Sequence, residues 1–193
     1  MKLFLKISPL IIFSFAASII LLQKQIQSTF QLLVDRKQVL GVESQQQTAM
    51  PKRLIIPKIN VDSNIQYVGL TAKGEMGIPN NTVDVGWFNL GSRPGELGTS
   101  VIAGHFDSEE GKPGVFANLY KLKGGDKIYV KDNEGVTTTF IVRESRAYVL
   151  GHDDEVFNSI NGSHLNLITC DGVWDTTTRS YSKRLVVFSD LAS

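Results

Sequence analysis

Short apolar runs separated by turn residues fill the chain from about residue 51 onward. Each run combines Val, Ile, Leu and aromatic residues and is bounded by Gly, Pro, Asn or Asp, which is the pattern of a β-strand. The runs predict strands at 53–59, 65–70, 83–88, 99–106, 127–131, 137–150, 164–170 and 184–188. Helical patterns are confined to 115–122 and 153–160. Many short strands with two short helices predict a mainly β domain built as a closed or nearly closed barrel.

A different pattern opens the chain, where residues 3–22 are apolar apart from one lysine, one proline and a few serines. This length matches the roughly 20 residues that a helix needs to cross a bilayer. A cleavable signal peptide is the alternative, but the small residues at 16–18 lie inside the apolar run. We therefore predict an uncleaved signal-anchor at 1–22. Lys2, Lys6 and the amino terminus precede or begin this segment, and they favour an extracytoplasmic position for the rest of the chain.

The segment 23–50 is rich in glutamine and has one semi-apolar patch, 30–34, that is long enough for a short helix. Its apolar content is too low for a core of its own, which is typical of a partly ordered spacer. The sequence thus predicts three parts: a membrane segment at 1–22, a stalk at 23–50 and a folded domain at 51–193.

Charge and cysteine content exclude several functions. Twenty basic and nineteen acidic residues give a net charge of +1. The sequence has no basic run of the kind that binds nucleic acid, so we expect no nucleic-acid partner. A single cysteine forms no internal disulfide, and no zinc-type spacing joins it to the three histidines. Glycine-rich phosphate loops are absent from the sequence. Any chemistry of the cysteine must therefore come from its own thiol, and we predict neither a metal nor a cofactor.

Cys170 ends the apolar run 164–170 and is followed by the turn signal Asp-Gly, so its thiol is expected where a strand meets a loop. His105 likewise ends the apolar run 99–105, directly after Gly104. Arg184 immediately precedes the last predicted strand. A free thiol is mostly protonated at neutral pH, so a catalytic cysteine needs a base or a positive neighbour. On residue type alone, a small buried hydrophobe is the better interpretation of Cys170, because most free cysteines are of that kind.

The other candidates for this site are weaker. His152 and His164 lie beside Gly and Ser in what read as exposed loops, where surface or structural roles are usual. Arg179 lies in the middle of the predicted loop 171–183, where a solvated charge is the simpler interpretation. Asp107, two residues after His105, fits the start of a loop better than a role in orienting the imidazole.

With Thr-Cys at 169–170, an arginine a short loop later and Ala-Gly-His at 103–105, the chain resembles the sortase family of cysteine transpeptidases from about residue 53 to 190. This resemblance implies an eight-stranded sortase β-barrel behind an N-terminal membrane anchor. It makes Cys170 the nucleophile, His105 the general acid/base and Arg184 the residue that steadies substrate and oxyanion. It also implies a groove that reads a Leu-Pro-x-Thr-Gly sorting signal on secreted proteins, and transfer of the cleaved protein to an amine of the cell wall.

Details within the family follow from the loops. Thr169 either helps to line the site with its hydroxyl or is an ordinary strand threonine. Trp174 and Tyr181 either wall the substrate groove or pack down the loop that carries them. The loop 89–96 carries a single acid, which does not support the calcium site of class A sortases. The stretches 105–108 and 170–175 look closer to classes D, E and F than to class C.

Two other functions fit the same residues. A non-catalytic β-barrel that binds a peptide or a wall component would carry a thiol of ordinary reactivity. A thiol peptidase would form the same acyl-enzyme and release it to water instead of an amine.

Overall fold

The computed structural model describes residues 22–32, 48–108, 110–151, 154–157 and 161–192. The predicted membrane segment 1–22 lies outside these residues except for its last position. Within the described residues, none of the helices combines the length and the apolar character that crossing a membrane requires. Residues 48–192 belong to one compact unit and 22–32 to another, and each is described by itself.

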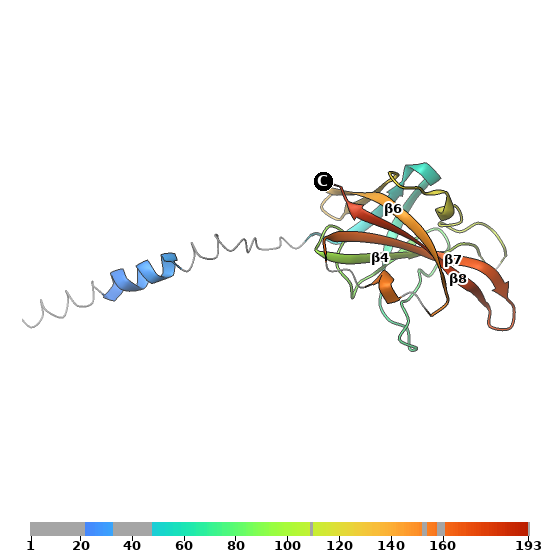
Figure 1. The fold of residues 1–193 in the computed structure, drawn as a ribbon, viewed down its shortest axis with the longest axis horizontal. Helices are drawn as coiled ribbons and strands as arrows, with labels where there is room; N and C mark the ends of the chain where they lie inside the picture. The colour runs from blue at the N-terminus through green and yellow to red at the C-terminus, as the bar shows by residue number, and fades with distance from the viewer. Residues whose placement is uncertain (1–21, 33–47, 109, 152–153, 158–160, 193) are drawn as a thin grey trace, which may run out of the picture. The chain divides into compact units, whose positions relative to one another are not determined.

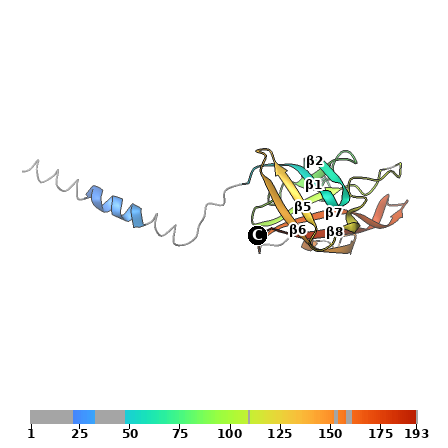
Figure 2. The same cartoon turned by 90° about the horizontal axis from the view of Figure 1, so that it is seen from above.

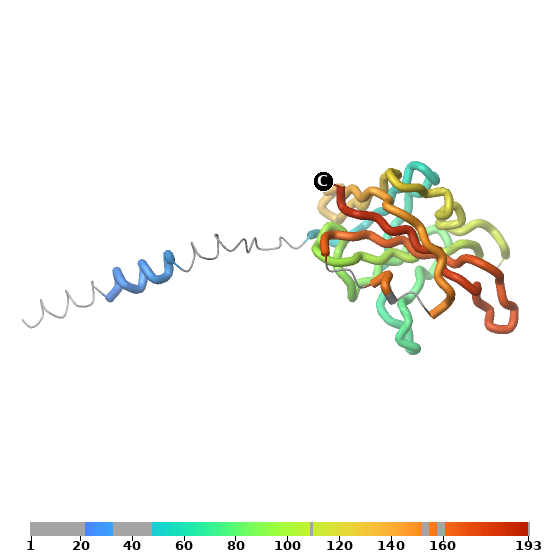
Figure 3. The backbone as a smooth tube through the Cα atoms, in the orientation of Figure 1, coloured from blue at the N-terminus to red at the C-terminus, as the bar shows by residue number. Residues whose placement is uncertain are grey.

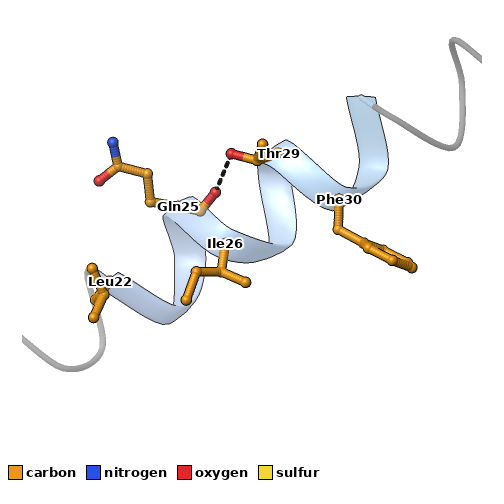
Figure 4. A pocket seen from close by; sticks show the side chains of 5 residues that line it. All are labelled: Leu22, Gln25, Ile26, Thr29 and Phe30. Atoms are coloured by element: carbon orange, nitrogen blue, oxygen red, sulfur yellow. Dashed lines mark hydrogen bonds between the residues drawn. The ribbon is translucent and has the colours of Figure 1, made fainter.

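Residues 22–32, at the start of the predicted stalk, form an α-helix. Leu22, Ile26 and Phe30 recur at every fourth position and are each at least 60% exposed, and with Gln25 and Thr29 they line a shallow surface hollow (Figure 4). The Thr29 hydroxyl donates to the Gln25 carbonyl oxygen at 2.8 Å. This helix is therefore amphipathic, with an apolar stripe on one side.

The larger unit is a closed barrel with strand order β1-β2-β3-β4-β7-β8-β6-β5, closed by antiparallel pairing of β1 with β5 (Figures 1 and 2). Two neighbouring pairs, β2 with β3 and β4 with β7, are parallel, and the others are antiparallel. The strands are β1 (Pro51–Ile56), β2 (Val61–Val68), β3 (Val85–Phe88), β4 (Gly98–Gly104), β5 (Lys127–Asp132), β6 (Thr137–Val149), β7 (Ser163–Asp175) and β8 (Ser180–Leu191). All eight predicted strands are confirmed.

The helix predictions inside the barrel domain were too long. The pattern at 115–122 yields only the 3-10 turn η2 (Leu119–Lys121), and within 153–160 the described residues hold the 3-10 turn η3 (Asp154–Val156). A third turn, η1 (Pro57–Ile59), replaces the end of the first predicted strand. Pro57 has no N–H to give to a ladder, and its fixed φ suits the first position of a helical turn.

The predicted loop 171–183 was wrong as well, because β7 and β8 continue past Cys170 as a two-stranded hairpin. A bulge at Gly172, whose φ is 84°, allows the extension, and Trp174 pairs with Tyr181 near its far end. The hairpin reaches beyond the rest of the barrel, as the tube in Figure 3 shows for the red segment.

Two apolar clusters hold the domain together. The larger cluster fills the barrel and includes Trp87, Phe116 and Phe140. The smaller one lies on the outer face of β4, β7 and β8, because alternate residues of a strand point to opposite sides of the sheet. Its buried members are Val101, Ala103, Val156, Ile168, Val186 and Phe188. Val156 belongs to η3, so the segment before β7 covers this outer face.

Candidate functional site

Three strands bring the predicted catalytic residues to one face of the sheet. Ala103 of β4 pairs with Ile168 of β7, and Ile168 pairs with Val186 of β8. All three side chains belong to the outer cluster. His105 and Cys170 each lie two residues after a member of this row, and Arg184 lies two residues before one. A period of two keeps a side chain on the same face, so the three polar residues continue the row of apolar ones.

The side chain between these positions points the other way. Thr169 is buried, and its hydroxyl donates to the Gly104 carbonyl oxygen at 2.8 Å. The structure therefore places Thr169 inside the barrel and does not bring its hydroxyl to the outer face with Cys170. The hydrogen bond ties the end of β4 to β7 directly beneath His105 and Cys170.

Glycine is needed immediately before the histidine because the backbone of Gly104 abuts a buried ring. A Cβ on Gly104 would lie 2.5 Å from Phe116 Cδ2, closer than carbon atoms approach. Phe116 in turn donates its N–H to the His105 carbonyl oxygen at 2.9 Å. Close packing and one hydrogen bond thus fix the backbone that presents the imidazole.

The imidazole of His105 is half-buried, and its Nε2 lies 3.0 Å from the Pro79 carbonyl oxygen. A carbonyl oxygen only accepts hydrogen bonds, so Nε2 is the nitrogen that carries the proton. In the neutral ring the second nitrogen, Nδ1, is then the basic one. His105 can therefore take up a proton at Nδ1 while Nε2 stays bound.

Cys170 and Arg184 are direct partners across β7 and β8. Partial burial raises the pKa of the Cys170 thiol, the positive charge of Arg184 acts to lower it, and the carboxylate of Asp107 acts to raise it. Burial is the largest of these effects. The thiol is therefore predominantly protonated at neutral pH, and a base must remove its proton before it can act as a nucleophile.

The guanidinium of Arg184 is held along the start of β8. Its Nη1 donates to the carbonyl oxygens of Lys183 at 2.9 Å and Tyr181 at 3.2 Å. Its charge still acts on Cys170. Arg179, the other candidate, lies in the hairpin turn with a φ of 50°, and only Arg184 sits in register with the cysteine.

Asp107 and Tyr181 add a second layer beside the thiol, and the structure gives Asp107 a partner that its interpretation as a loop-starting residue did not include. The Tyr181 hydroxyl donates to Asp107 Oδ2, which with burial raises the pKa of Tyr181 to about 12. The Tyr181 ring meets those of Trp174 and Phe106 edge-on, with centroids 5.1 Å and 5.7 Å away. The predicted groove residues Trp174 and Tyr181 thus form an aromatic wall that joins the hairpin to the loop after β4.

The remaining candidates lie elsewhere. His164 is at the start of β7, where its Nδ1 lies 2.7 Å from Asp190 Oδ1 and its Nε2 lies 2.8 Å from the Asn161 carbonyl oxygen. It therefore links strand ends remote from Cys170. His152 lies outside the described residues. Across the described part of the chain, no three His, Cys, Asp or Glu side chains gather as metal ligands would.

The comparison with family models decides the family. The model of the sortase domain matches residues 54–192, which is most of the chain and includes all eight strands except the start of β1. The chain belongs to the sortase family. A curated relative, sortase A of Bacillus anthracis, is 36% identical over 94 residues, and the match spans 49% of this chain and 40% of that protein.

Solved sortases share the fold of this sortase domain. Sortase C-1 of Actinomyces oris is 25% identical with a TM-score of 0.57, covering 73% of each chain. The sortase D5 transpeptidase of Clostridium perfringens is 23% identical with a TM-score of 0.56, covering 75% of this chain and 79% of that one. A lid mutant of sortase A from Corynebacterium diphtheriae is 22% identical with a TM-score of 0.59, covering 83% and 78%. The TM-scores and identities are much the same for sortases named A, C and D. These similarities therefore support the fold and do not select a class.

Proposed function

We propose that this protein is a cysteine transpeptidase that cleaves a sorting signal and transfers the acyl part to an amine. The observation that carries the proposal is the shared outer face of β4, β7 and β8. On this face Cys170 pairs with Arg184, and His105 extends the parallel strand beside it. A thiol, a base and a fixed positive charge side by side on one face of the sheet are what acyl transfer through a thioester needs.

In the first half-reaction, His105 accepts the thiol proton at Nδ1 as Cys170 Sγ attacks the scissile carbonyl carbon. The new S–C bond leaves a negative oxygen, which Arg184 stabilises with its guanidinium donors. When the tetrahedral intermediate collapses, the C–N bond breaks and His105 returns the proton to the departing amine. The product is a thioester on Cys170.

In the second half-reaction, an incoming amine attacks the thioester carbonyl and gives its proton to His105. The C–S bond then breaks, and the thiolate of Cys170 takes the proton back. Atoms and charge balance over the cycle, and no redox partner is needed. The raised pKa of the thiol makes this proton transfer by His105 necessary at neutral pH.

The finer parts of the proposal come from the sequence. A signal-anchor at 1–22 would hold the catalytic domain on the extracytoplasmic side of the cell membrane, with secreted proteins carrying a Leu-Pro-x-Thr-Gly-like signal as donors. Cleavage would fall between Thr and Gly, and a cell-wall amine would be the acceptor. The loops around His105 and Cys170 favour a class D, E or F enzyme.

The test is turnover of a fluorogenic Leu-Pro-x-Thr-Gly peptide by the full chain in detergent micelles, with a glycine-based amine as acceptor. We expect Cys170→Ala to abolish turnover and His105→Gln to lower it about 10²-fold or more. Arg184→Gln should lower turnover about 10²-fold, whereas the matched variant Arg179→Gln should stay close to wild type. Equal turnover by wild type and Cys170→Ala would refute the nucleophile.

Product masses and thiol reactivity separate this proposal from the two other functions. A transpeptidase gives the amine adduct as the main product, whereas a thiol peptidase gives the hydrolysed acid even when amine is in excess. A binding module shows no turnover, and alkylation of its Cys170 is the same with and without His105. Either result would contradict the proposal.

A further inference from the structure

The imidazole of His105 is oriented by a backbone carbonyl, and that carbonyl lies in a loop that nothing in the sequence marked as functional. Pro79 belongs to the connection between β2 and β3, twenty-six residues before His105. Pro79 is buried, and it packs over the backbone of Gly86, where a Cβ would lie 3.2 Å from Pro79 Cδ. The position of this carbonyl therefore depends on what holds the peptide group that contains it.

One side chain holds that peptide group. The N–H of Asn80 belongs to the same peptide as the Pro79 carbonyl, and it donates to Gln66 Oε1 at 3.1 Å. Gln66 Nε2 donates in return to Asn80 Oδ1 at 2.7 Å. Hydrogen bonds on both ends of one peptide polarise it in the same direction and strengthen each other. Gln66 thus fixes the plane of the peptide whose oxygen accepts the hydrogen bond from His105 Nε2.

Gln66 is itself anchored on a carboxylate. Its Nε2 also donates to Asp84 Oδ2 at 3.0 Å, and Asn81 Nδ2 donates to the same oxygen at 2.8 Å. These hydrogen bonds lower the pKa of Asp84, which keeps the carboxylate ionised at neutral pH. The result is a continuous chain from Asp84 through the Gln66 amide and the 79–80 peptide to His105.

From this chain we propose that Gln66 is a positioning residue for the acid/base His105. It acts through the Pro79 carbonyl, which holds the proton on Nε2 and leaves Nδ1 to exchange protons with Cys170. Partners beyond the reacting groups commonly set the tautomer and orientation of a functional histidine. The expected fall in kcat rests on the proposed transpeptidase function, whereas the hydrogen bond of His105 Nε2 does not depend on it.

The test uses the full chain in detergent micelles and compares Gln66→Met with wild type. Methionine keeps the length of the side chain and removes both the donor and the acceptor. We expect kcat to fall about tenfold with KM nearly unchanged, because the change affects proton transfer rather than peptide binding. Asn64→Ala is the matched control, because Asn64 lies on the same strand and contacts Asp84 Oδ1 at 3.4 Å but is not bonded to the 79–80 peptide. It should stay within about twofold of wild type.

A second readout is independent of activity. In the chain labelled with ¹⁵N-histidine, the Nε2–H resonance of His105, assigned with His105→Gln, should be visible in wild type and in Asn64→Ala because its proton is hydrogen-bonded. It should broaden or vanish in Gln66→Met. Should Gln66→Met not fold, Gln66→Leu serves instead, since its side chain also carries neither a donor nor an acceptor.

Retention of the resonance together with unchanged kcat in a folded Gln66 variant would overturn the positioning role. A wild-type protein that turns over no peptide would refute the transpeptidase proposal instead. The resonance would still decide the role of Gln66 in that case, so the two failures are distinguishable.

Discussion

The packing of Gly104 against Phe116 makes the sharpest prediction about the site. Alanine at 104 places a Cβ 2.5 Å from Phe116 Cδ2, 2.8 Å from Phe116 Cγ and 2.8 Å from Val115 Cγ1. Phe116 is fully buried, so the ring must shift by about an ångström within a close-packed core. Overpacking of this kind costs about 1–3 kcal/mol of the free energy of unfolding.

For a domain of this size, each kcal/mol lowers Tm by about 2–4 °C. Gly104→Ala should therefore unfold several degrees below wild type in a thermal melt followed by circular dichroism. It should also lower kcat, because Phe116 donates its N–H to the His105 carbonyl oxygen. The control is Gly69→Ala, whose new Cβ would meet nothing closer than Asn89 Oδ1 at 3.7 Å, and which should change stability by less than about 0.5 kcal/mol.

A double-mutant cycle with Phe116→Leu tests the cause. The smaller side chain gives room for the added methyl group, so the two substitutions should be less than additive, with a coupling of at least about 0.5 kcal/mol. Additive losses, or equal melting of Gly104→Ala and Gly69→Ala, would refute the steric explanation of this glycine.

Three further predictions follow from the charges around Cys170 and in the 79–84 loop. Arg184→Gln should move the pH dependence of Cys170 alkylation to higher pH and Asp107→Asn should move it to lower pH, because these charges act on the thiol pKa in opposite directions; parallel shifts would contradict this. The pKa of Asp84 is lowered from 3.8 in the folded protein, so its contribution to stability is present above about pH 4 and is lost as the pH falls through the folded pKa. Below about pH 4, the free energy of unfolding from denaturant melts should therefore fall less steeply with decreasing pH for Asp84→Asn than for wild type. Equal declines in the two proteins would contradict this prediction. Asp107→Asn should lower the pKa of Tyr181 from about 12 in an ultraviolet titration, and an unchanged curve would refute the bond between Tyr181 and Asp107.

Local pattern was enough to predict the strands. Each of the eight is a short apolar run with its own turn signals, and the barrel has the number of strands that the sequence predicts. Cys170 and His105 stood out for the same local reason, since each ends an apolar run of the sequence, although β7 continues past Cys170 to Asp175. The 3-10 turn at Pro57 also has a local cause that the prediction overlooked, because proline ends a ladder.

Contacts between distant segments could not be predicted in this way. The hairpin that replaces the predicted loop 171–183 is built by strand pairing, with Trp174 against Tyr181 near its tip. The bond between Tyr181 and Asp107 spans 74 residues. Only the barrel topology, which sets the loop after β4 beside the hairpin, brings these two side chains together.

The sequence by itself therefore determined which residues can do chemistry, and the tertiary structure decided how they are presented. The period of two along β4, β7 and β8 puts His105, Cys170 and Arg184 on one face and sends Thr169 inside. That outcome depends on strand register, which is set by pairing across the sheet rather than by any single strand. The proton on His105 Nε2 is likewise placed by the Pro79 carbonyl oxygen. The position of this backbone atom cannot be predicted from the residue types of the sequence.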